Sequence, residues 1–468
     1  MSFTSYSFII FLSCVLALYW LVKKREWQNA ILLAASYIFY GWITPQLALM
    51  LGASTLFDYF LARGMQTKPG RTRLFMVLSL ILNLGVLVFF KYYNFFSDDL
   101  ARIATLFGMN GDFFLTRILL PAGLSFYTLK KFGYMIDVSR GTLKPTHSLV
   151  DFALYVSFFP QIVAGPIERP QKLLPQIESL RMWKAEYFYN AWPLIVMGLF
   201  KKVVIADTIK TIVDRVFGLS EPNLVLVISA TLGFTLQILA DFSGYTDISR
   251  GLASLLGFQT SENFKNPYLS LSPTEFWNRW HITLSTWLRD YIFFPVRRGL
   301  MRSRRKLPNW VTQFLPPMLT MLASGVWHGA GWNFILWGFL HGIWIVLYQV
   351  MGLHGEWKPS GLVKNALAWL AMFTFILFSW LLFRAPSIQW VFGVFSTNPL
   401  QATTNDWAVA LIALTMMAFY CLPLLIKLLM DRYWKDSTFA HNLYYALATI
   451  AIIVYINSST PDFIYFQF

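Results

Sequence analysis

Residues 73–92 read RLFMVLSLILNLGVLVFFKY, and no residue between Arg73 and Lys91 carries a charge. A helix needs about 20 mostly apolar residues to cross a membrane, so this stretch predicts a transmembrane helix. Similar stretches recur along the chain, and some of them are expected to be re-entrant or interfacial. We therefore predict an all-α, polytopic bundle of about ten to twelve spans around a central polar cavity. The candidate spans, with soft ends, are residues 4–22, 27–44, 46–62, 73–92, 113–137, 150–165, 188–206, 222–240, 311–326, 333–352, 364–384, 407–427 and 441–457.

The composition also indicates a membrane protein. Of 468 residues, 56% are hydrophobic and only 13% are charged, about half the charged share of a soluble domain. The net charge of +15 does not indicate nucleic-acid binding, because the basic residues form short runs between apolar stretches, such as Lys23–Arg25 and Lys201–Lys202. Such runs are typical of cytoplasmic loops. If Lys23–Arg25 is cytoplasmic, the N-terminus lies on the outer, periplasmic side of the membrane.

The segment Ser272–Asp290, SPTEFWNRWHITLSTWLRD, is too polar for lipid and too aromatic for open water. Ser272 is a suitable helix N-cap, Pro273 fits the first helical position, and Glu275 completes a capping box. We therefore expect one helix that starts at Ser272 and carries both His281 and Asp290. This helix would pack inside the bundle or lie at the membrane interface.

A second polar segment, Ala323–Gly342, begins at the end of an apolar span and contains His328 and His341. Histidine is costly at membrane depth, and it is suited to take a proton from a hydroxyl near neutral pH. The glycines that flank His328 allow close approach of a substrate or of another helix. A core histidine bonded to a neighbouring helix is one interpretation. We favour a functional role for His328 and then for His281, with His341 in support.

A third polar segment, Leu236–Gly251, contains Asp241, Tyr245 and Asp247. If it is helical, Asp247 and Arg250 are three residues apart and could pair. Two interpretations explain this segment equally well. It could form hydrogen bonds that join two helices, or it could be part of the wall of a polar cavity.

A fourth segment, Phe158–Pro170, contains three prolines and one glycine, so a continuous helix is not expected there. Broken backbone at membrane depth is tolerated only when protein buries it or when it lines a cavity, which favours a re-entrant segment. The sequence has no phosphate-binding loop, no dinucleotide motif, no nucleophile elbow and no cluster of metal-binding His and Cys residues. A nucleotide-hydrolysing transporter is therefore not predicted.

At these segments the sequence resembles the membrane-bound O-acyltransferase (MBOAT) family, and within it the bacterial branch of alginate O-acetylation proteins. The resemblance covers roughly residues 1–390 of what we predict to be a single membrane domain, 1–468. One departure is Lys130-Lys131, where relatives often have Gln-Ser. The matching stretches are PAGLSFYTLKKFGYMIDVSRG (121–141), FFPQIVAGPIER (158–169), DFSGYTDISR (241–250), NFKNPYLSLSPTEFWNRWHITLSTWLRDYIFFP (263–295), WHGAGWNFILWGFLHG (327–342) and FSWLLFRA (378–385).

The resemblance implies an integral membrane enzyme of the bacterial inner membrane that moves acetyl groups from a cytoplasmic donor toward hydroxyls of an exported polysaccharide. The polysaccharide could be alginate, cellulose or peptidoglycan. His328 would be the catalytic histidine and His281 its partner. Acetyl-CoA would be the acyl donor, with no bound cofactor and no metal. Residues expected to line the cavity or to bind substrate are Asp241, Tyr245, Asp247, Trp280, Trp287, Asp290, Trp327, Trp332 and Asn333.

The same resemblance implies partners. They are a periplasmic, acetyltransferase-like protein of the SGNH hydrolase type and a polysaccharide synthase or export complex, with membrane lipid around the bundle. A polysaccharide or lipid transporter would use the same polar cavity, as would a scaffold of an export complex. These two functions are the alternatives to the enzyme.

Overall fold

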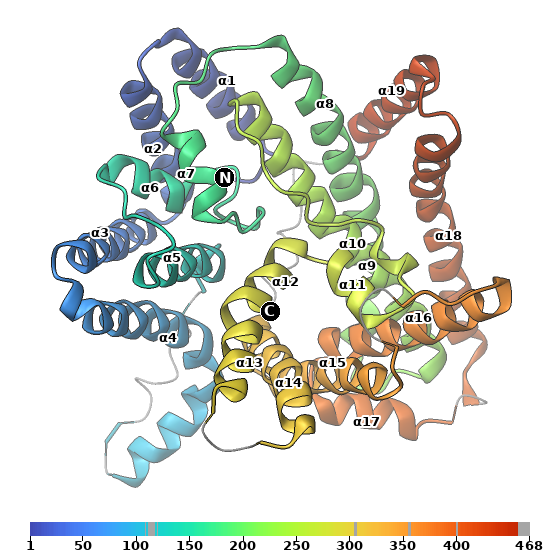
Figure 1. The fold of residues 1–468 in the computed structure, drawn as a ribbon. Coiled ribbons are helices and arrows are strands. Elements are labelled where there is room, and N and C mark those ends of the chain that lie inside the picture. Colours follow the sequence, from blue (N-terminus) through green and yellow to red (C-terminus); the bar gives the residue numbers. More distant parts are fainter. Residues whose placement is uncertain are drawn as a thin grey trace. The chain divides into compact units, whose positions relative to one another are not determined.

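The fold is taken from a computed structural model that describes residues 1–107, 109–110, 118, 120–303, 307–353, 357–398 and 401–456. Across these ranges the regular structure is helical, as the coiled ribbons in Figure 1 show. The predicted all-α, polytopic fold is confirmed. The chain forms two compact units, one of Met1–Ile195 with Ile248–Ser261 and the other of Val196–Asp247 with Glu262–Phe468.

The first unit packs α2, α3, α5 and α6 around buried aromatic side chains. The rings of Tyr134 and Phe152 lie 4.6 Å apart, and those of Phe158 and Phe258 lie 4.8 Å apart. Its helices are α1 (Tyr6–Leu21), α2 (Arg25–Gly41), α3 (Pro45–Thr67), the short 3₁₀ turn η1 (Pro69–Arg71), α4 (Thr72–Leu106), α5 (Leu124–Ser139), α6 (Leu149–Ser157), α7 (Pro170–Ile177), most of α8 (Ala185–Leu199) and the end of α10 (Leu224–Leu255).

The proline-rich segment in this unit is not a continuous helix, as predicted. Helix α6 ends at Ser157 and α7 begins at Pro170, with turns between them. The turns pack tightly against Gly123, which has a φ of 75°. A Cβ atom there would overlap the carbonyl oxygen of Ile162, so only glycine fits both the backbone and the space. The segment is buried within the unit, and its re-entrant placement in the membrane stays a prediction.

Lys131, one of the two lysines that depart from the family pattern, is fully buried in α5. Its Nζ lies 3.1 Å from Oδ2 of Asp58 in α3. Asp58 also accepts hydrogen bonds from Ser79 Oγ (2.6 Å) and Asn83 Nδ2 (2.8 Å) of α4. A buried charge is tolerated when it is paired and its partner is hydrogen-bonded. The departure from the family pattern is therefore accommodated by polar side chains of two neighbouring helices.

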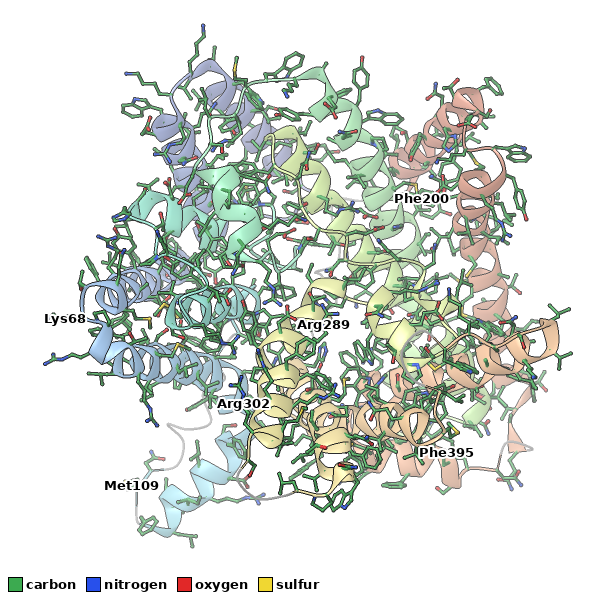
Figure 2. The ribbon with its side chains drawn as sticks, in the orientation of Figure 1. Lys68, Met109, Phe200, Arg289, Arg302 and Phe395 are labelled. Atoms are coloured by element: carbon green, nitrogen blue, oxygen red, sulfur yellow. The ribbon has the colours of Figure 1, made fainter. Side chains whose placement is uncertain are left out.

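The second unit contains a tight antiparallel hairpin of α14 and α15 (Figure 1). Its helical segments include two π-helical stretches, and Figure 2 labels the first residue of each, Phe200 and Arg289. The segments are η3 (Phe200–Ala206), α9 (Asp207–Phe217), the first part of α10, η4 (Pro267–Leu269), α11 (Pro273–Arg279), α12 (Ile282–Leu288), η5 (Arg289–Phe293), α13 (Phe294–Met301), α14 (Asn309–His328), α15 (Trp332–Val350), α16 (Leu362–Arg384), α17 (Ile388–Ser396), α18 (Thr404–Tyr433) and α19 (Thr438–Tyr455).

Within the described ranges, six helices are long and apolar enough to cross a membrane, against the ten to twelve spans predicted. Several other predicted spans form helices that are shorter or less apolar. The predicted span 150–165 is helical only where α6 covers it. Part of the predicted span 113–137 lies outside the described residues. Helix α6, for example, has only nine residues, because the prolines stop it. The six are Pro69–Ser97, Leu224–Leu255, Trp332–Val350, Leu362–Arg384, Thr404–Tyr433 and Thr438–Tyr455.

The predicted cap of the helix at Ser272 is confirmed. The Ser272 hydroxyl accepts a hydrogen bond from the Glu275 backbone N–H at 3.2 Å, and Pro273 is the first helical residue. In a capping box, the Glu275 carboxylate would accept a hydrogen bond from the backbone N–H of Ser272. Here it accepts instead from the backbone N–H of Leu271, at 2.8 Å.

Replacing Ser272 with alanine is expected to lower the free energy of unfolding by about 1 kcal/mol, because the first turn of α11 loses its cap. Thermal unfolding of the purified protein in detergent measures this loss. Ser272→Asp keeps a capping oxygen and should unfold at nearly the wild-type temperature. Equal losses in the two variants would show that the cap does not stabilise this helix.

Candidate active site

His328 is the last residue of α14, and glycines set its position. A Cβ atom at Gly325 would overlap the carbonyl oxygen of Phe334, and one at Gly338 would overlap that of Met321. Helices α14 and α15 can approach this closely only because both positions lack side chains. The close approach places His328, which is 5% exposed, against α15. At these two positions, the glycines serve the approach of another helix.

His281 does not lie within a continuous helix, so that prediction is wrong. Helix α11 ends at Arg279, Trp280 is extended, and His281 has left-handed backbone angles, φ 43° and ψ 53°. Helix α12 then starts at Ile282. A left-handed conformation costs a non-glycine residue about 1–2 kcal/mol, and such strain is typical of functional sites.

Asn263 explains the break at His281. Its backbone carbonyl accepts from the N–H of Ile282 at 3.0 Å. Its side-chain Oδ1 accepts from the N–H of Thr283 at 3.0 Å and from the Thr283 hydroxyl at 2.9 Å. Two of these bonds satisfy the backbone N–H groups that a continuous helix would have satisfied, and the third holds the Thr283 side chain in place. Asn263 was not among the predicted site residues, although it opens the matching stretch 263–295.

The same Asn263 oxygen fixes the protonation of the His281 ring. Nδ1 of His281 lies 3.3 Å from Oδ1, which already accepts two hydrogen bonds and therefore accepts this one as well. Nδ1 must then carry the proton, which leaves Nε2 as the acceptor nitrogen. Burial lowers the pKa of His281 to about 3, so the ring is neutral at physiological pH.

This depressed pKa predicts how stability depends on pH. His281 lies outside the six candidate spans, and its pKa falls from 6.5 in the unfolded chain to about 3 in the folded protein. Between these values the unfolded chain binds more protons, so stability decreases as the pH falls. The loss is expected to be up to about 1.4 kcal/mol per pH unit below 6.5.

Unfolding temperatures measured at pH 7 and pH 5 check this prediction. His281→Asn removes the titrating ring, keeps a residue that tolerates left-handed angles, and should show a smaller difference between the two pH values. If the variant and the wild type lose the same stability on acidification, His281 is not the group responsible.

The second unit brings the two predicted histidines to one indole ring. The ring centroid of Trp327 lies 6.3 Å from that of His281 and 4.8 Å from that of His328. The ring of Phe242 lies 4.7 Å from that of His281, and the ring of Phe383 lies 5.2 Å from that of His328. Both histidines are therefore buried in one aromatic cluster and share Trp327 as a neighbour.

The third polar segment forms ion pairs that the sequence did not suggest. Lys202 Nζ lies 2.9 Å from Asp241 Oδ1 and 2.8 Å from Asp207 Oδ1, and Lys201 Nζ lies 2.7 Å from Asp247 Oδ2. The interpretation of Lys201–Lys202 as part of a cytoplasmic loop is wrong, because both lysines lie in η3. Paired charges at buried positions are typical of helix contacts as well as of polar sites.

The remaining predicted residues lie in different surroundings. Trp280 is 2% exposed and packs on Trp380 at 4.9 Å. Trp332 is 68% exposed, so its side chain does not belong to the buried cluster. The others are Trp287, which contacts the ring of Tyr291 at 5.0 Å; Asn333, whose Nδ2 donates to the carbonyl of Ala385 at 3.3 Å; Asp290, which lies 3.5 Å from Arg289; and Tyr245, which is half-buried in α10.

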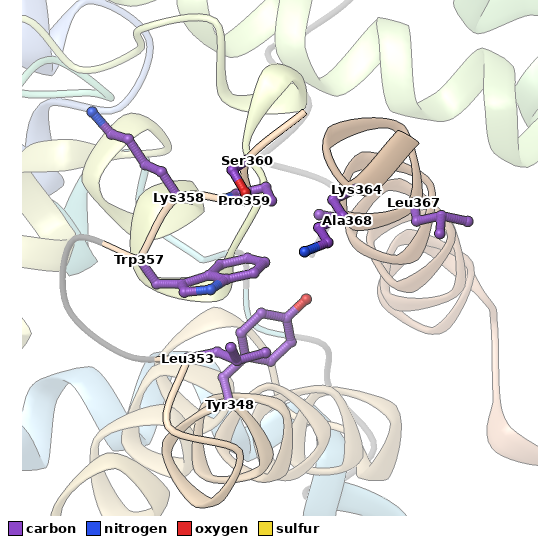
Figure 3. Close-up of a pocket in the computed structure, with 9 residues that line it drawn as sticks. All are labelled: Tyr348, Leu353, Trp357, Lys358, Pro359, Ser360, Lys364, Leu367 and Ala368. Carbon is purple, nitrogen blue, oxygen red and sulfur yellow. The ribbon is translucent and has the colours of Figure 1, made fainter. Parts of the chain in front are cut away.

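A cavity of about 480 Å³ in the second unit is not the histidine site. It is lined by residues from the end of α15, from the segment that follows it and from the start of α16, and Figure 3 shows Lys364 pointing toward the space between Trp357 and Tyr348. His328 precedes the opposite end of α15. A helix rises 1.5 Å per residue, so about 25 Å of α15 separates them. The chemistry of the histidines must therefore be judged from their own surroundings.

The geometry suits proton transfer in a water-poor site. A neutral imidazole has an acceptor nitrogen that can take a proton from a hydroxyl. Aromatic walls lower the local dielectric constant and strengthen each polar interaction inside. A buried histidine pair in a multi-pass helical protein could therefore support acyl transfer to a hydroxyl.

The comparison with protein families agrees. The model of the family "MBOAT, membrane-bound O-acyltransferase family" matches residues 138–383, more than half of the chain, and this range contains both histidines. The chain belongs to this family and is an O-acyltransferase of the multi-pass membrane type.

Individual relatives support the same assignment. The probable alginate O-acetylase AlgI of Pseudomonas aeruginosa is 39% identical over 83% of this chain and 73% of its own length. The peptidoglycan O-acetyltransferase of Helicobacter pylori is 34% identical, over 76% of this chain and 71% of its own. The teichoic acid D-alanyltransferase of Bacillus subtilis is 29% identical, over 56% of this chain and 68% of its own.

Proposed function

We propose that this protein transfers acetyl groups to hydroxyls of an exported polysaccharide, with His328 as the catalytic base. The observation that carries the proposal is the buried pair of histidines against Trp327, inside the region that the family model matches. The names of the relatives support acetyl transfer to a cell-surface polymer. Alginate-type and peptidoglycan-type polymers are the acceptor classes that these relatives suggest, and cellulose rests on the sequence resemblance alone.

The proposed reaction needs one proton carrier. The acceptor hydroxyl attacks the carbonyl carbon of the acyl donor, a new C–O bond forms, and the hydroxyl proton passes to His328. The bond between the carbonyl carbon and the sulfur of a thioester donor breaks, and the departing sulfur takes the proton from His328. An ester and a thiol result, and His328 returns to its neutral form.

His281 has a different role in this proposal. Its Nδ1–H is held by Asn263, and its backbone is held at the start of α12, so the ring is fixed in place. The acceptor nitrogen Nε2 can then orient the hydroxyl that attacks. Fixing a reactant in the productive geometry lowers the barrier without any covalent step.

The acyl donor, the membrane orientation and the partner proteins are also part of the proposal. Acetyl-CoA is the proposed thioester, delivered from the cytoplasm. The basic run at Lys23–Arg25 supports a periplasmic N-terminus in the bacterial inner membrane. We include a periplasmic acetyltransferase-like protein of the SGNH hydrolase type and a polysaccharide synthase or export complex as proposed partners.

The experiment removes the protein and measures two quantities, the acetyl ester content of the exported polymer and the amount of polymer. The proposal predicts that the ester content falls to background while the amount of polymer is unchanged. A transporter or a scaffold would instead lose export of the polymer itself, and that result would overturn the proposal. Complementation with the wild-type chain should restore the ester.

A further inference from the structure

Several buried polar atoms beside His328 have no hydrogen-bond partner among the described protein groups. They are the hydroxyl of Ser324, the indole N–H of Trp337 and Nε2 of His341. All three side chains are at most 3% exposed. Leaving such groups unsatisfied costs free energy, so buried polar groups in native proteins are usually bonded to protein, water or ligand.

These atoms belong to one contiguous cluster. Ser324 lies one helical turn before His328 on the same face of α14. The ring of Trp337 lies 5.1 Å from His328, and His341 follows one turn later on α15, 4.5 Å from Trp337. Phe383 contacts both His328 and Trp337, at 5.2 and 5.6 Å, and adds an apolar wall. The unsatisfied groups therefore adjoin the histidine that we assign as the base.

The chemistry of these groups limits what they bind. An indole N–H donates and cannot accept, whereas a serine hydroxyl and a neutral imidazole nitrogen can serve in either role. The group that bonds Trp337 must therefore present an acceptor atom, such as a carbonyl oxygen. In an acyl transfer, the carbonyl oxygen gains negative charge as the hydroxyl attacks, and donors placed there stabilise the transition state.

We propose that Trp337, with Ser324 and His341, forms the binding site for the carbonyl oxygen of the acyl group. Trp337 donates its N–H to that oxygen, and the other two groups complete the polar surroundings. This inference rests on the proposed function, because it assigns the acyl group to the same site. It makes Trp337 a catalytic residue of α15 that neither the sequence motifs nor the relatives' names assign.

The test is Trp337→Phe, which removes the N–H and keeps an aromatic ring. We expect kcat for acetyl transfer to fall about 100-fold, the usual effect of losing one such donor, with the KM for acetyl-CoA within about two-fold. Trp344→Phe is the matched control on the same helix, because its indole N–H already donates to Met372 Sδ at 3.2 Å. The control should leave kcat and KM nearly unchanged.

A second variant separates function from folding. Ser324→Ala removes an unsatisfied hydroxyl without enlarging a side chain, so the substrate-free protein should unfold at a higher temperature while kcat falls.

Equal kcat in Trp337→Phe and Trp344→Phe would overturn the inference, as would a raised KM with unchanged kcat. A stabilised Ser324→Ala with full activity would show that water alone occupies the site. If the wild-type protein transfers no acetyl group, the proposed function fails as well. If only His328 variants are inactive, the inference alone fails.

Discussion

Replacing His328 with alanine is expected to lower acetyl transfer by about 10²- to 10⁴-fold, the contribution usual for a positioned base. The hydroxyl of a sugar is a poor nucleophile until its proton is removed, and the buried imidazole of His328 lies 5.1 Å from the ring of Trp337 in the proposed carbonyl site. The acetyl ester content of the exported polymer measures the loss. The amount of exported polymer should not change.

Two further variants make this result specific. His328→Gln keeps a polar side chain of similar size but cannot carry the proton, so it should be as inactive as the alanine variant while unfolding near the wild-type temperature. His147→Ala changes a histidine that contacts Arg63 in the first unit and should retain normal ester content. Normal esterification in His328→Gln would exclude His328 as the base.

The largest expected loss of stability comes from Gly338→Leu. A side chain at Gly338 would overlap the backbone of α14 at Met321, and the facing residue Gly325 lies equally close to α15. The helices can make room only by separating, which costs about 3 kcal/mol or more because core packing does not relax freely. Separation would also move His328 away from Trp337, so activity should be lost together with stability.

Gly393→Ala is the matched glycine control. Gly393 lies within α17, and a Cβ atom there would meet no atom within 4 Å. Alanine is a better helix former than glycine, so this variant should be unchanged or more stable by about 0.5–1 kcal/mol. Unfolding temperatures in detergent measure both variants. If Gly338→Leu unfolds like the wild type, the helices do not depend on glycine at their contact.

The sequence predicted the features that depend on local pattern. Apolar stretches of spanning length, the cap at Ser272 and the broken segment near Pro160 and Pro166 each follow from residues that are neighbours in the chain. The histidines also stood out locally, because polar residues are rare among such apolar surroundings. The cap and the broken segment are confirmed in the fold, and six of the predicted spans form helices of spanning length within the described residues, while the catalytic roles of the histidines stay predictions.

Features that depend on distant partners were not predictable in this way. The break at His281 is made by Asn263, 18 residues earlier in the chain, and no helical spacing indicates that contact. Trp332 adjoins a glycine-rich turn beside His328 in the sequence, but its side chain is largely exposed. Adjacency in sequence does not determine which way a side chain points at the start of a helix.

The charge partners of Lys201 and Lys202 were also not predictable from the local sequence. Short basic runs usually mark cytoplasmic ends of helices. Here Lys202 lies between two carboxylates, those of Asp207 and Asp241, which are five and 39 residues away. Only the packing of η3 against α10 shows that these charges neutralise one another inside the unit.

The role of His328 in acetyl transfer is tested most directly in inverted membrane vesicles, which expose the cytoplasmic side and enclose the periplasmic proteins. Vesicles with the wild-type chain or with His328→Gln receive acetyl-CoA labelled in the acetyl group, and ester-linked label on enclosed polysaccharide is measured. Wild-type vesicles should acquire the label, and His328→Gln vesicles should show only background label. Equal label in both would contradict the claim that His328 carries out acyl transfer.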